Sequence, residues 1–190
     1  MIARTYAELI RPDKKAAALL FDLLMVVGAS LLISLSNLLR VPFPGSPVPI
    51  TGQTFAVVIL GALLGSKRAP AAVLLYLLYG VAGLPVYSGG ALAGPTGGYL
   101  LGFVFAAFVV GLLCEQRLDR RYHTAVAAML VGNIILYIPG LIWLSFFVGG
   151  DKAFILGFFP YIPGDLVKLA LAAILLPSGW KIINHWRRQS

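Results

Sequence analysis

Long apolar runs separated by short polar segments dominate the chain, and six of them are predicted as membrane-spanning helices. We expect spans at residues 16–39, 53–65, 69–83, 98–115, 123–148 and 163–183, preceded by a polar segment at residues 1–15. The second and third runs are shorter than the roughly 20 residues that cross a bilayer, so they must extend into their loops or be buried by neighbouring helices. The pattern therefore predicts an all-α membrane protein in which residues 1–190 form a single membrane domain.

Composition supports this interpretation. Of the residues, 59% are hydrophobic and 12% are charged, whereas an ordinary globular domain has about 25% charged residues. A soluble fold would expose too much apolar surface, and an outer-membrane barrel would have alternating strands of about ten residues instead of long apolar runs. The single cysteine, Cys114, excludes an internal disulfide. No group of His, Asp and Glu has metal-ligand spacing, so we expect no metal and no cofactor.

Basic residues predict the orientation of the chain in the membrane. If the six spans alternate in direction, 12 of the 15 Lys and Arg residues fall on one side: Arg4, Arg11, Lys14, Lys15, Lys67, Arg68, Arg117, Arg120, Arg121, Lys181, Arg187 and Arg188. Cytoplasmic loops carry the excess of Lys and Arg, so both termini are expected in the cytoplasm. This topology also accounts for the net charge of +8, and we expect no nucleic-acid partner.

The three loops predicted on the outer side are rich in Pro and Gly, at residues 40–52, 84–98 and 149–163. Irregular backbone at membrane depth is tolerated where it lines a cavity or is covered by protein. Asp165 and Lys168 stand beneath these loops, three residues apart, so on a helix they share one face. An ionisable pair in a span marks a functional site by default. The alternative is an internal salt bridge that only holds helices together.

Other residues of these loops are further candidates. The segment Gly94-Pro-Thr-Gly-Gly-Tyr99 is either a turn that starts a helix or backbone that approaches a ligand closely. Tyr87 and Tyr161 fall near the outer interface, where aromatic residues commonly form a belt. Stacking of one of them on a ligand is the alternative.

Several segments resemble the BioY family of biotin-uptake S components, and they occur in the same order along the chain. They are Val48-Pro-Ile-Thr-Gly-Gln-Thr54, Gly83-Leu-Pro-Val-Tyr87, Gly94-Pro-Thr-Gly-Gly-Tyr-Leu-Leu-Gly-Phe103, Tyr137-Ile-Pro-Gly-Leu-Ile-Trp143 and Pro160-Tyr-Ile-Pro-Gly-Asp-Leu-Val-Lys168. The resemblance implies a six-helix, substrate-binding subunit of an energy-coupling-factor (ECF) vitamin transporter, which catalyses no chemical change. It also implies a bacterial cell membrane, biotin as the solute, and an ECF transmembrane coupling protein with ATPase subunits as partners.

The resemblance implies roles for particular residues as well. Asp165 and Lys168 match the pair that contacts the ureido ring in the family. A carboxylate and an ammonium suit this ring, because it offers two N–H donors and one carbonyl acceptor. Neutral contacts and a lid are expected from the loops. The residues expected to supply substrate contacts besides the pair are Gln53, Tyr87, Thr96, Tyr99 and Tyr161.

Three other functions stay open at this point. S components dock through an Ala-xxx-Ala pattern in the first span, whereas this chain has Asp22-Leu-Leu-Met-Val26 there, so uptake without a dedicated partner is one alternative. A proton-coupled carrier that uses Asp165 as its proton site is a second, and it predicts uptake that collapses with the proton gradient. An intramembrane enzyme acting on lipid is a third, for which the sequence offers no nucleophile or metal set.

Overall fold

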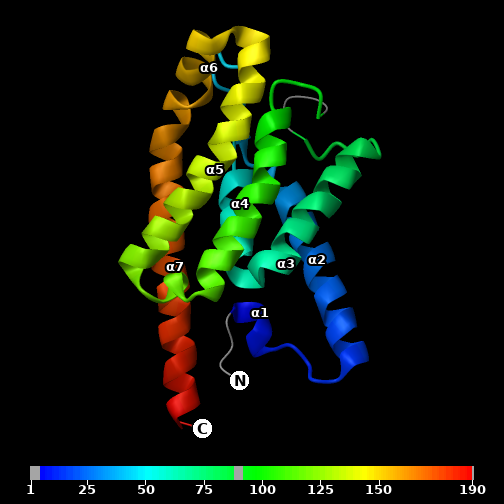
Figure 1. Ribbon diagram of the computed structural model, residues 1–190, viewed down its shortest axis with the longest axis vertical. Coiled ribbons are helices and arrows are strands. Elements are labelled where there is room, and N and C mark those ends of the chain that lie inside the picture. The colour runs from blue at the N-terminus through cyan, green and yellow to red at the C-terminus, as the bar shows by residue number, and fades with distance from the viewer. Residues whose placement is uncertain (1–4, 88–91, 190) are drawn as a thin grey trace.

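Helices make up nearly all of the structure, a computed structural model that describes residues 5–87 and 92–189, the last three by their backbone alone (Figure 1). The helices are α1 (Tyr6–Leu9), α2 (Lys15–Ser36), α3 (Gln53–Val81), α4 (Gly97–Glu115), α5 (Tyr122–Val148), α6 (Gly150–Gly157) and α7 (Ile162–Gln189), with short 3-10 turns η1 (Leu118–Arg120) and η2 (Phe159–Tyr161). Within the described residues, five helical stretches are long and apolar enough to cross a membrane. The chain is therefore an all-α, multi-pass membrane protein, as its apolar runs predict.

The long helices run side by side, with α4 in the middle of the bundle (Figure 1). Helix α4 packs against α3 and α5, α2 covers α3, and α7 packs on α5. Helix α1 and the last turns of α7 lie at the same end, at the bottom of Figure 1, which we call the terminal end. Helix α6 lies at the opposite end, which we call the α6 end.

Helix α3 consists of two helices joined at a kink. Gly65 has φ 85° and ψ 179°, a conformation that glycine adopts freely and other residues avoid. Just past the kink, the Ser66 N–H (2.7 Å) and hydroxyl (2.8 Å) both donate to Glu115 Oε1, which fixes the bend against the end of α4. The predicted short spans at 53–65 and 69–83 correspond to the two halves, and neighbouring helices bury much of both.

The segment at residues 149–163 differs from the predicted loop, because it contains α6 and η2. Residues 150–157 hold no proline, and Asp151 lies in the first turn of α6, where the helix dipole favours a negative charge. Pro160 lies in the first turn of η2 and Pro163 near the start of α7, positions where a missing N–H is tolerated. The Pro and Gly residues of this segment thus mark helix ends instead of a continuous loop.

The segment at residues 40–52 is non-helical, as its four prolines predict. Strands β1 (Arg40–Val41) and β2 (Ile50–Thr51) pair antiparallel, with Arg40 opposite Thr51. This short ribbon is a small departure from a purely helical fold. Of the predicted loop at 84–98, residues 88–91 lie outside the described part of the chain.

Large apolar side chains cover the outside of the bundle. Leu20 is 58% exposed, Phe105 59% and Phe146 79%. Water would disfavour apolar surface of this extent, whereas a bilayer solvates it. The outer surface of the bundle therefore agrees with the lipid bilayer as the surroundings predicted from the sequence.

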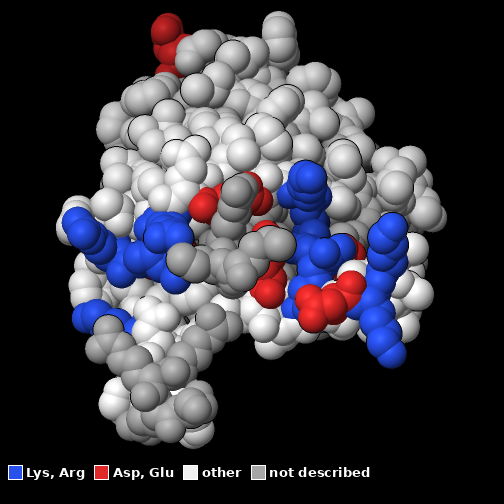
Figure 2. Space-filling model, turned by 60° about the horizontal axis from the view of Figure 1, so that its bottom comes forward, with Lys and Arg blue, Asp and Glu red and all other residues white. Residues whose placement is uncertain are grey.

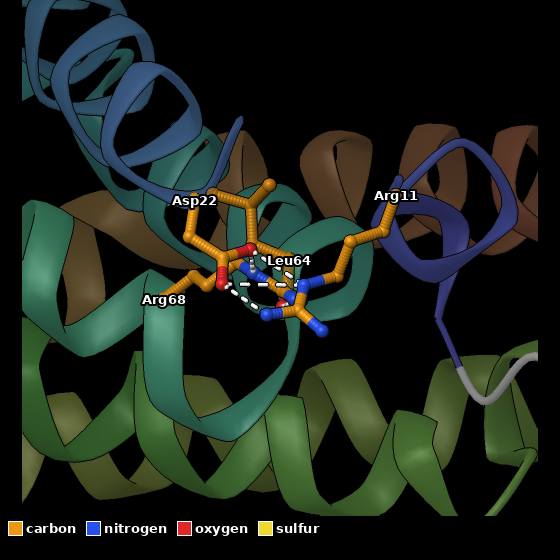
Figure 3. A network of polar contacts seen from close by, with 4 residues as sticks. All are labelled: Arg11, Asp22, Leu64 and Arg68. Atoms are coloured by element: carbon orange, nitrogen blue, oxygen red, sulfur yellow. Dashed lines mark hydrogen bonds and ion pairs between the residues drawn. The ribbon is translucent and has the colours of Figure 1, made fainter. Parts of the chain in front are cut away.

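Charged side chains gather at the terminal end (Figure 2). Asp22, in the second turn of α2, accepts hydrogen bonds from Arg11 (Nη2 to Oδ2, 2.7 Å) and from Arg68 (Nε to Oδ1, 2.7 Å). Figure 3 shows that the three side chains come from the N-terminal segment, α2 and α3. Arg68 also donates to the Leu64 carbonyl (3.3 Å). The network therefore ties the N-terminal segment to both helices.

Candidate solute-binding site

Asp165 and Lys168 lie on one face of α7 near its start, as their spacing predicts. Lys168 Nζ is 3.3 Å from Asp165 Oδ1, and the two side chains are 20% and 10% exposed, respectively. The pair lies at the α6 end, because α7 follows η2 and α6 directly. The ion pair itself lies within a single helix, so it does not by itself join two helices.

Each charge has further partners from other parts of the fold. The Tyr137 hydroxyl of α5 donates to Asp165 Oδ2. Lys168 Nζ donates to the Thr51 carbonyl (2.9 Å) and to the Thr54 hydroxyl (2.7 Å). An ammonium has three N–H donors, and with Asp165 these two oxygens engage all of them. The position of both side chains is therefore fixed by α3, α5 and the segment before α3.

The pair lies in the wall of a cavity of about 500 Å³, measured with its open mouth. Small-molecule sites commonly have mostly apolar walls with a few polar groups. The lining residues are Val48, Pro49, Thr51, Gln53, Thr54, Thr96, Tyr99, Leu100, Phe103, Leu136, Tyr137, Tyr161, Asp165 and Lys168. Apolar and aromatic side chains dominate this set, and its charges come from α7.

The structure brings most of the predicted site residues together. Those that line the cavity are Asp165, Lys168, Tyr99, Thr96, Gln53 and Tyr161. Gln53 Nε2 donates to the Tyr76 hydroxyl (2.6 Å), which fixes its amide. Tyr87 is not among the lining residues: its hydroxyl donates to the Leu77 carbonyl, and its ring packs edge-on against Tyr76 with centroids 5.5 Å apart. Tyr87 thus holds the segment after α3 against that helix.

Two side chains fasten the segment at residues 42–51, which contributes Val48, Pro49 and Thr51 to the cavity wall. The Tyr161 hydroxyl donates to the Val48 carbonyl and lies 3.1 Å from the Ser46 hydroxyl. Lys168 donates to the Thr51 carbonyl at the end of the same segment. Side chains that line the cavity therefore also hold this segment in place.

Glycines make room for the Tyr99 ring between α4, α5 and α6. A Cβ on Gly140 would lie 2.4 Å from Tyr99 Cδ1, and a Cβ on Gly157 would lie 2.4 Å from the Tyr99 hydroxyl oxygen. That hydroxyl donates to the Gly157 carbonyl (2.8 Å). A Cβ on Gly98 would lie 2.3 Å from the Pro139 carbonyl oxygen. Gly98 thus serves close packing of α4 on α5, and α4 begins at Gly97 as the turn interpretation predicts.

Tyr137 and Thr54 belong to the cavity but are absent from the residues predicted by sequence. Tyr137 is 8% exposed, and a buried tyrosine hydroxyl usually has a hydrogen-bond partner. A tyrosine inside an apolar span is therefore a signal that a polar partner lies nearby, although it does not say which one. Thr54 follows Gln53 at the start of α3. Its place next to a predicted site residue was the signal in the sequence that could have identified it.

The fold and the cavity together define a class of protein: a polytopic helical membrane protein that holds a largely apolar pocket with one ion pair in its wall. Comparison with known proteins gives the family. The chain belongs to the BioY family, whose sequence model matches residues 12–185.

Individual relatives agree with this assignment. The chain is 40% identical over 161 residues to the probable biotin transporter BioY of Pyrococcus horikoshii, covering 82% of this chain and 89% of that one. It is 41% identical over 162 residues to the biotin transporter BioY of Thermotoga maritima, with 82% and 89% covered. A crystal structure of the S-component for biotin from an ECF-type ABC transporter matches with a TM-score of 0.76 and 26% identity, over 90% of this chain and 95% of that chain. The family resemblance of the sequence segments is thereby confirmed.

Proposed function

We propose that this protein captures biotin at the α6 end and mediates its uptake as the S component of an ECF-type transporter. The observation that carries the proposal is the ion pair of Asp165 and Lys168 in the wall of a cavity lined mainly by apolar and aromatic side chains. A ureido group has two N–H donors and one carbonyl, so it complements a carboxylate beside an ammonium. The apolar walls suit the apolar ring and chain of biotin. Relatives named as biotin transporters support this solute over a lipid substrate for an enzyme.

We assign the contacts within the site as follows. Asp165 accepts the N–H groups of the ureido ring and Lys168 donates to its carbonyl. Gln53, Thr96 and Tyr99 supply neutral contacts from the cavity wall, and Tyr161 supplies one from η2. Tyr87, which does not line the cavity in this structure, contributes only if the segment after α3 moves when the ligand binds.

The proposed topology has six crossings and both termini in the cytoplasm. The kink at Gly65 divides α3 into two crossings, which turns five helical stretches into six spans. Both described ends of the chain lie at the terminal end, together with most of the cations (Figures 1 and 2). The positive-inside rule assigns that end to the cytoplasm of a cell membrane. The cavity then opens to the outside.

The partners that we propose are an ECF transmembrane coupling protein and its ATPase subunits. The similar solved structure is described as a component of such a transporter. The alternative is a solitary or proton-coupled carrier. Uptake of labelled biotin into proteoliposomes separates the two, because an S component requires the ATPase module and ATP. Uptake by the chain alone that collapses with the proton gradient would establish the carrier instead.

Calorimetric titration tests the site. Purified protein in detergent should bind biotin and desthiobiotin, which keeps the ureido ring, and should not bind thiamine. Asp165→Asn leaves Lys168 beside a neutral amide, and loss of one partner of a buried charge pair costs about 2–5 kcal/mol. The dissociation constant for biotin should therefore rise roughly 30- to 5,000-fold.

Asp151→Asn is the matched control, because Asp151 is an exposed carboxylate of the same end that does not line the cavity. It should leave biotin binding unchanged. Equal biotin affinity of Asp165→Asn and Asp151→Asn, with both proteins folded by circular dichroism, would overturn the site assignment.

A further inference from the structure

A second hollow lies at the terminal end, on the opposite end of the bundle from the biotin cavity. It has about 1,000 Å³ including its wide mouth, between η1, the start of α5 and the last part of α7. Its lining residues are Gln116, Arg117, Leu118, Arg120, Arg121, Thr124, Pro177, Trp180, Lys181 and Asn184. Four of these are cations and none is an acid. We call it the basic hollow.

The two acidic residues closest in sequence are engaged within the bundle. Asp119 is fully buried, pairs with Arg120 (3.3 Å) and accepts the Trp180 indole N–H. Glu115 accepts both hydrogen bonds from Ser66 at the kink of α3. Neither carboxylate is among the lining residues. Asp119 thus offsets the charge of Arg120, while Arg117, Arg121 and Lys181 give the lining an excess of positive charge.

The backbone at Arg117 is unusual. Its φ of 70° is the one positive value outside glycine in the described part of the chain. The residue follows the end of α4, a position where Gly or Asn is favoured because other side chains are strained there. The dipole at the end of α4 favours a positive charge at this place. Arg117 is exposed, so this turn presents its charge at the surface of the hollow.

Aromatic and apolar residues place the hollow at the level of lipid headgroups. The Arg120 guanidinium lies 3.1 Å from the centroid of the Trp180 ring, and Lys181 Nζ lies 4.6 Å from that of Tyr122. Tyr122 is 43% exposed, and exposed tyrosines concentrate where the hydrocarbon meets the polar interface. Trp180 is buried and holds Arg120 in place. Leu118 and Pro177 are apolar residues of the lining beside the cations. The geometry combines a phosphate-binding rim with a surface that suits the start of an acyl chain.

We propose that the basic hollow binds the phosphate of an anionic phospholipid from the leaflet at the terminal end. Basic pockets between membrane helices recognise such headgroups, and arginine guanidinium forms bidentate hydrogen bonds with phosphate. Bound there, the lipid bridges η1 to α7, two elements that are already joined through Asp119 and Trp180.

The test uses the full chain in dodecyl maltoside micelles, doped with phosphatidylglycerol, with phosphatidylcholine or with sodium phosphate alone. Native mass spectrometry measures the fraction that retains lipid, and thermal unfolding measures stabilisation. Phosphatidylglycerol should bind and raise the unfolding temperature more than phosphatidylcholine. Arg117→Gln/Arg121→Gln removes two exposed cations of the hollow and should weaken this binding roughly 30-fold. Binding should also weaken at 1 M salt, because exposed charges are screened.

Lys14→Gln/Lys15→Gln is the matched control, because it removes two exposed cations of the same end that do not line the hollow. This control should bind lipid as the unaltered protein does, and both variants should keep biotin binding, which reports that they are folded. Equal loss in both double variants would show a general surface attraction and overturn the proposal. Full stabilisation by sodium phosphate alone would replace the lipid with a free anion. Unchanged lipid binding with lost ATPase-module copurification in Arg117→Gln/Arg121→Gln would assign the hollow to a protein partner.

Discussion

Replacing Tyr137 with phenylalanine tests whether the cavity depends on a carboxylate held in one orientation. The Tyr137 hydroxyl donates to Asp165 Oδ2, while Lys168 Nζ is 3.3 Å from the other oxygen. Without the hydroxyl, the carboxylate is oriented by the lysine alone. A hydrogen bond to a charged group contributes about 1.5–3 kcal/mol. We therefore expect biotin affinity to fall roughly 10- to 150-fold in Tyr137→Phe.

Calorimetric titration with biotin measures this effect, and Tyr79→Phe is the control. The Tyr79 hydroxyl lies 3.1 Å from Ser30 Oγ, away from the cavity, so this variant also loses one hydroxyl contact. Its biotin affinity should stay within about threefold of the unaltered protein, since a neutral hydrogen bond far from the ligand has little influence on binding.

A double-mutant cycle distinguishes positioning from a general packing effect. In an Asp165→Asn background the Tyr137 hydroxyl no longer meets a charge, so Tyr137→Phe should cost less than about threefold there. An equal loss of affinity in both backgrounds would show that Tyr137 acts through packing or by touching the ligand itself. Unchanged biotin affinity of Tyr137→Phe alone would show that the Tyr137 hydroxyl does not orient Asp165 for the ligand.

Two further predictions concern stability, and thermal unfolding in detergent measures both. Asp22→Asn removes the carboxylate that two arginines share and should lower the free energy of unfolding by about 1–2 kcal/mol, because a partly exposed network contributes less than a buried one. Asp13→Asn, on the exposed N-terminal segment, should leave stability unchanged. An equal loss of stability in the two variants would contradict a stabilising role of the network. Gly140→Ala places a Cβ 2.4 Å from the Tyr99 ring and should cost about 1–3 kcal/mol, whereas Gly164→Ala, with nothing within 4 Å of its Cβ, should be tolerated. Tolerance of Gly140→Ala would show that the ring has room to shift.

Local sequence patterns predict much of this fold because helical periodicity and apolar length are local properties. The apolar runs give the helices, and a spacing of three residues places Asp165 and Lys168 on one face. The short length of two runs also indicates their burial, which the structure shows for the two halves of α3. Proline and glycine content was less informative, because it predicted a loop at residues 149–163, where the structure has α6 and η2 between the Pro and Gly residues.

Contacts between distant segments are what the sequence could not supply. Lys168 bonds to Thr51, 117 residues earlier, and Tyr137 reaches Asp165 across 28 residues. No period or spacing encodes these pairs, because they depend on how the helices pack. Tyr87 is a different case: a family-like segment suggests a place in the site, and in the structure its hydroxyl bonds to α3 and it does not line the cavity, so its contact with the solute stays a prediction.

The hydrogen bonds of the cavity bear on how it selects its solute. In the structure, Lys168 and Asp165 form hydrogen bonds with each other and with Tyr137, Thr51 and Thr54, so neither charge is left unpaired in the cavity. A solute that uses them exchanges one set of hydrogen bonds for another, and the net gain per bond is small. A solute that lacks the ureido group leaves the hydrogen bonds of Asp165 and Lys168 in place, so neither charge loses its partners. On the proposed function, discrimination then depends on whether the solute displaces the Lys168 contact to Thr51, which also holds residues 42–51 in place. Selectivity for the ring is thereby coupled to movement of that segment.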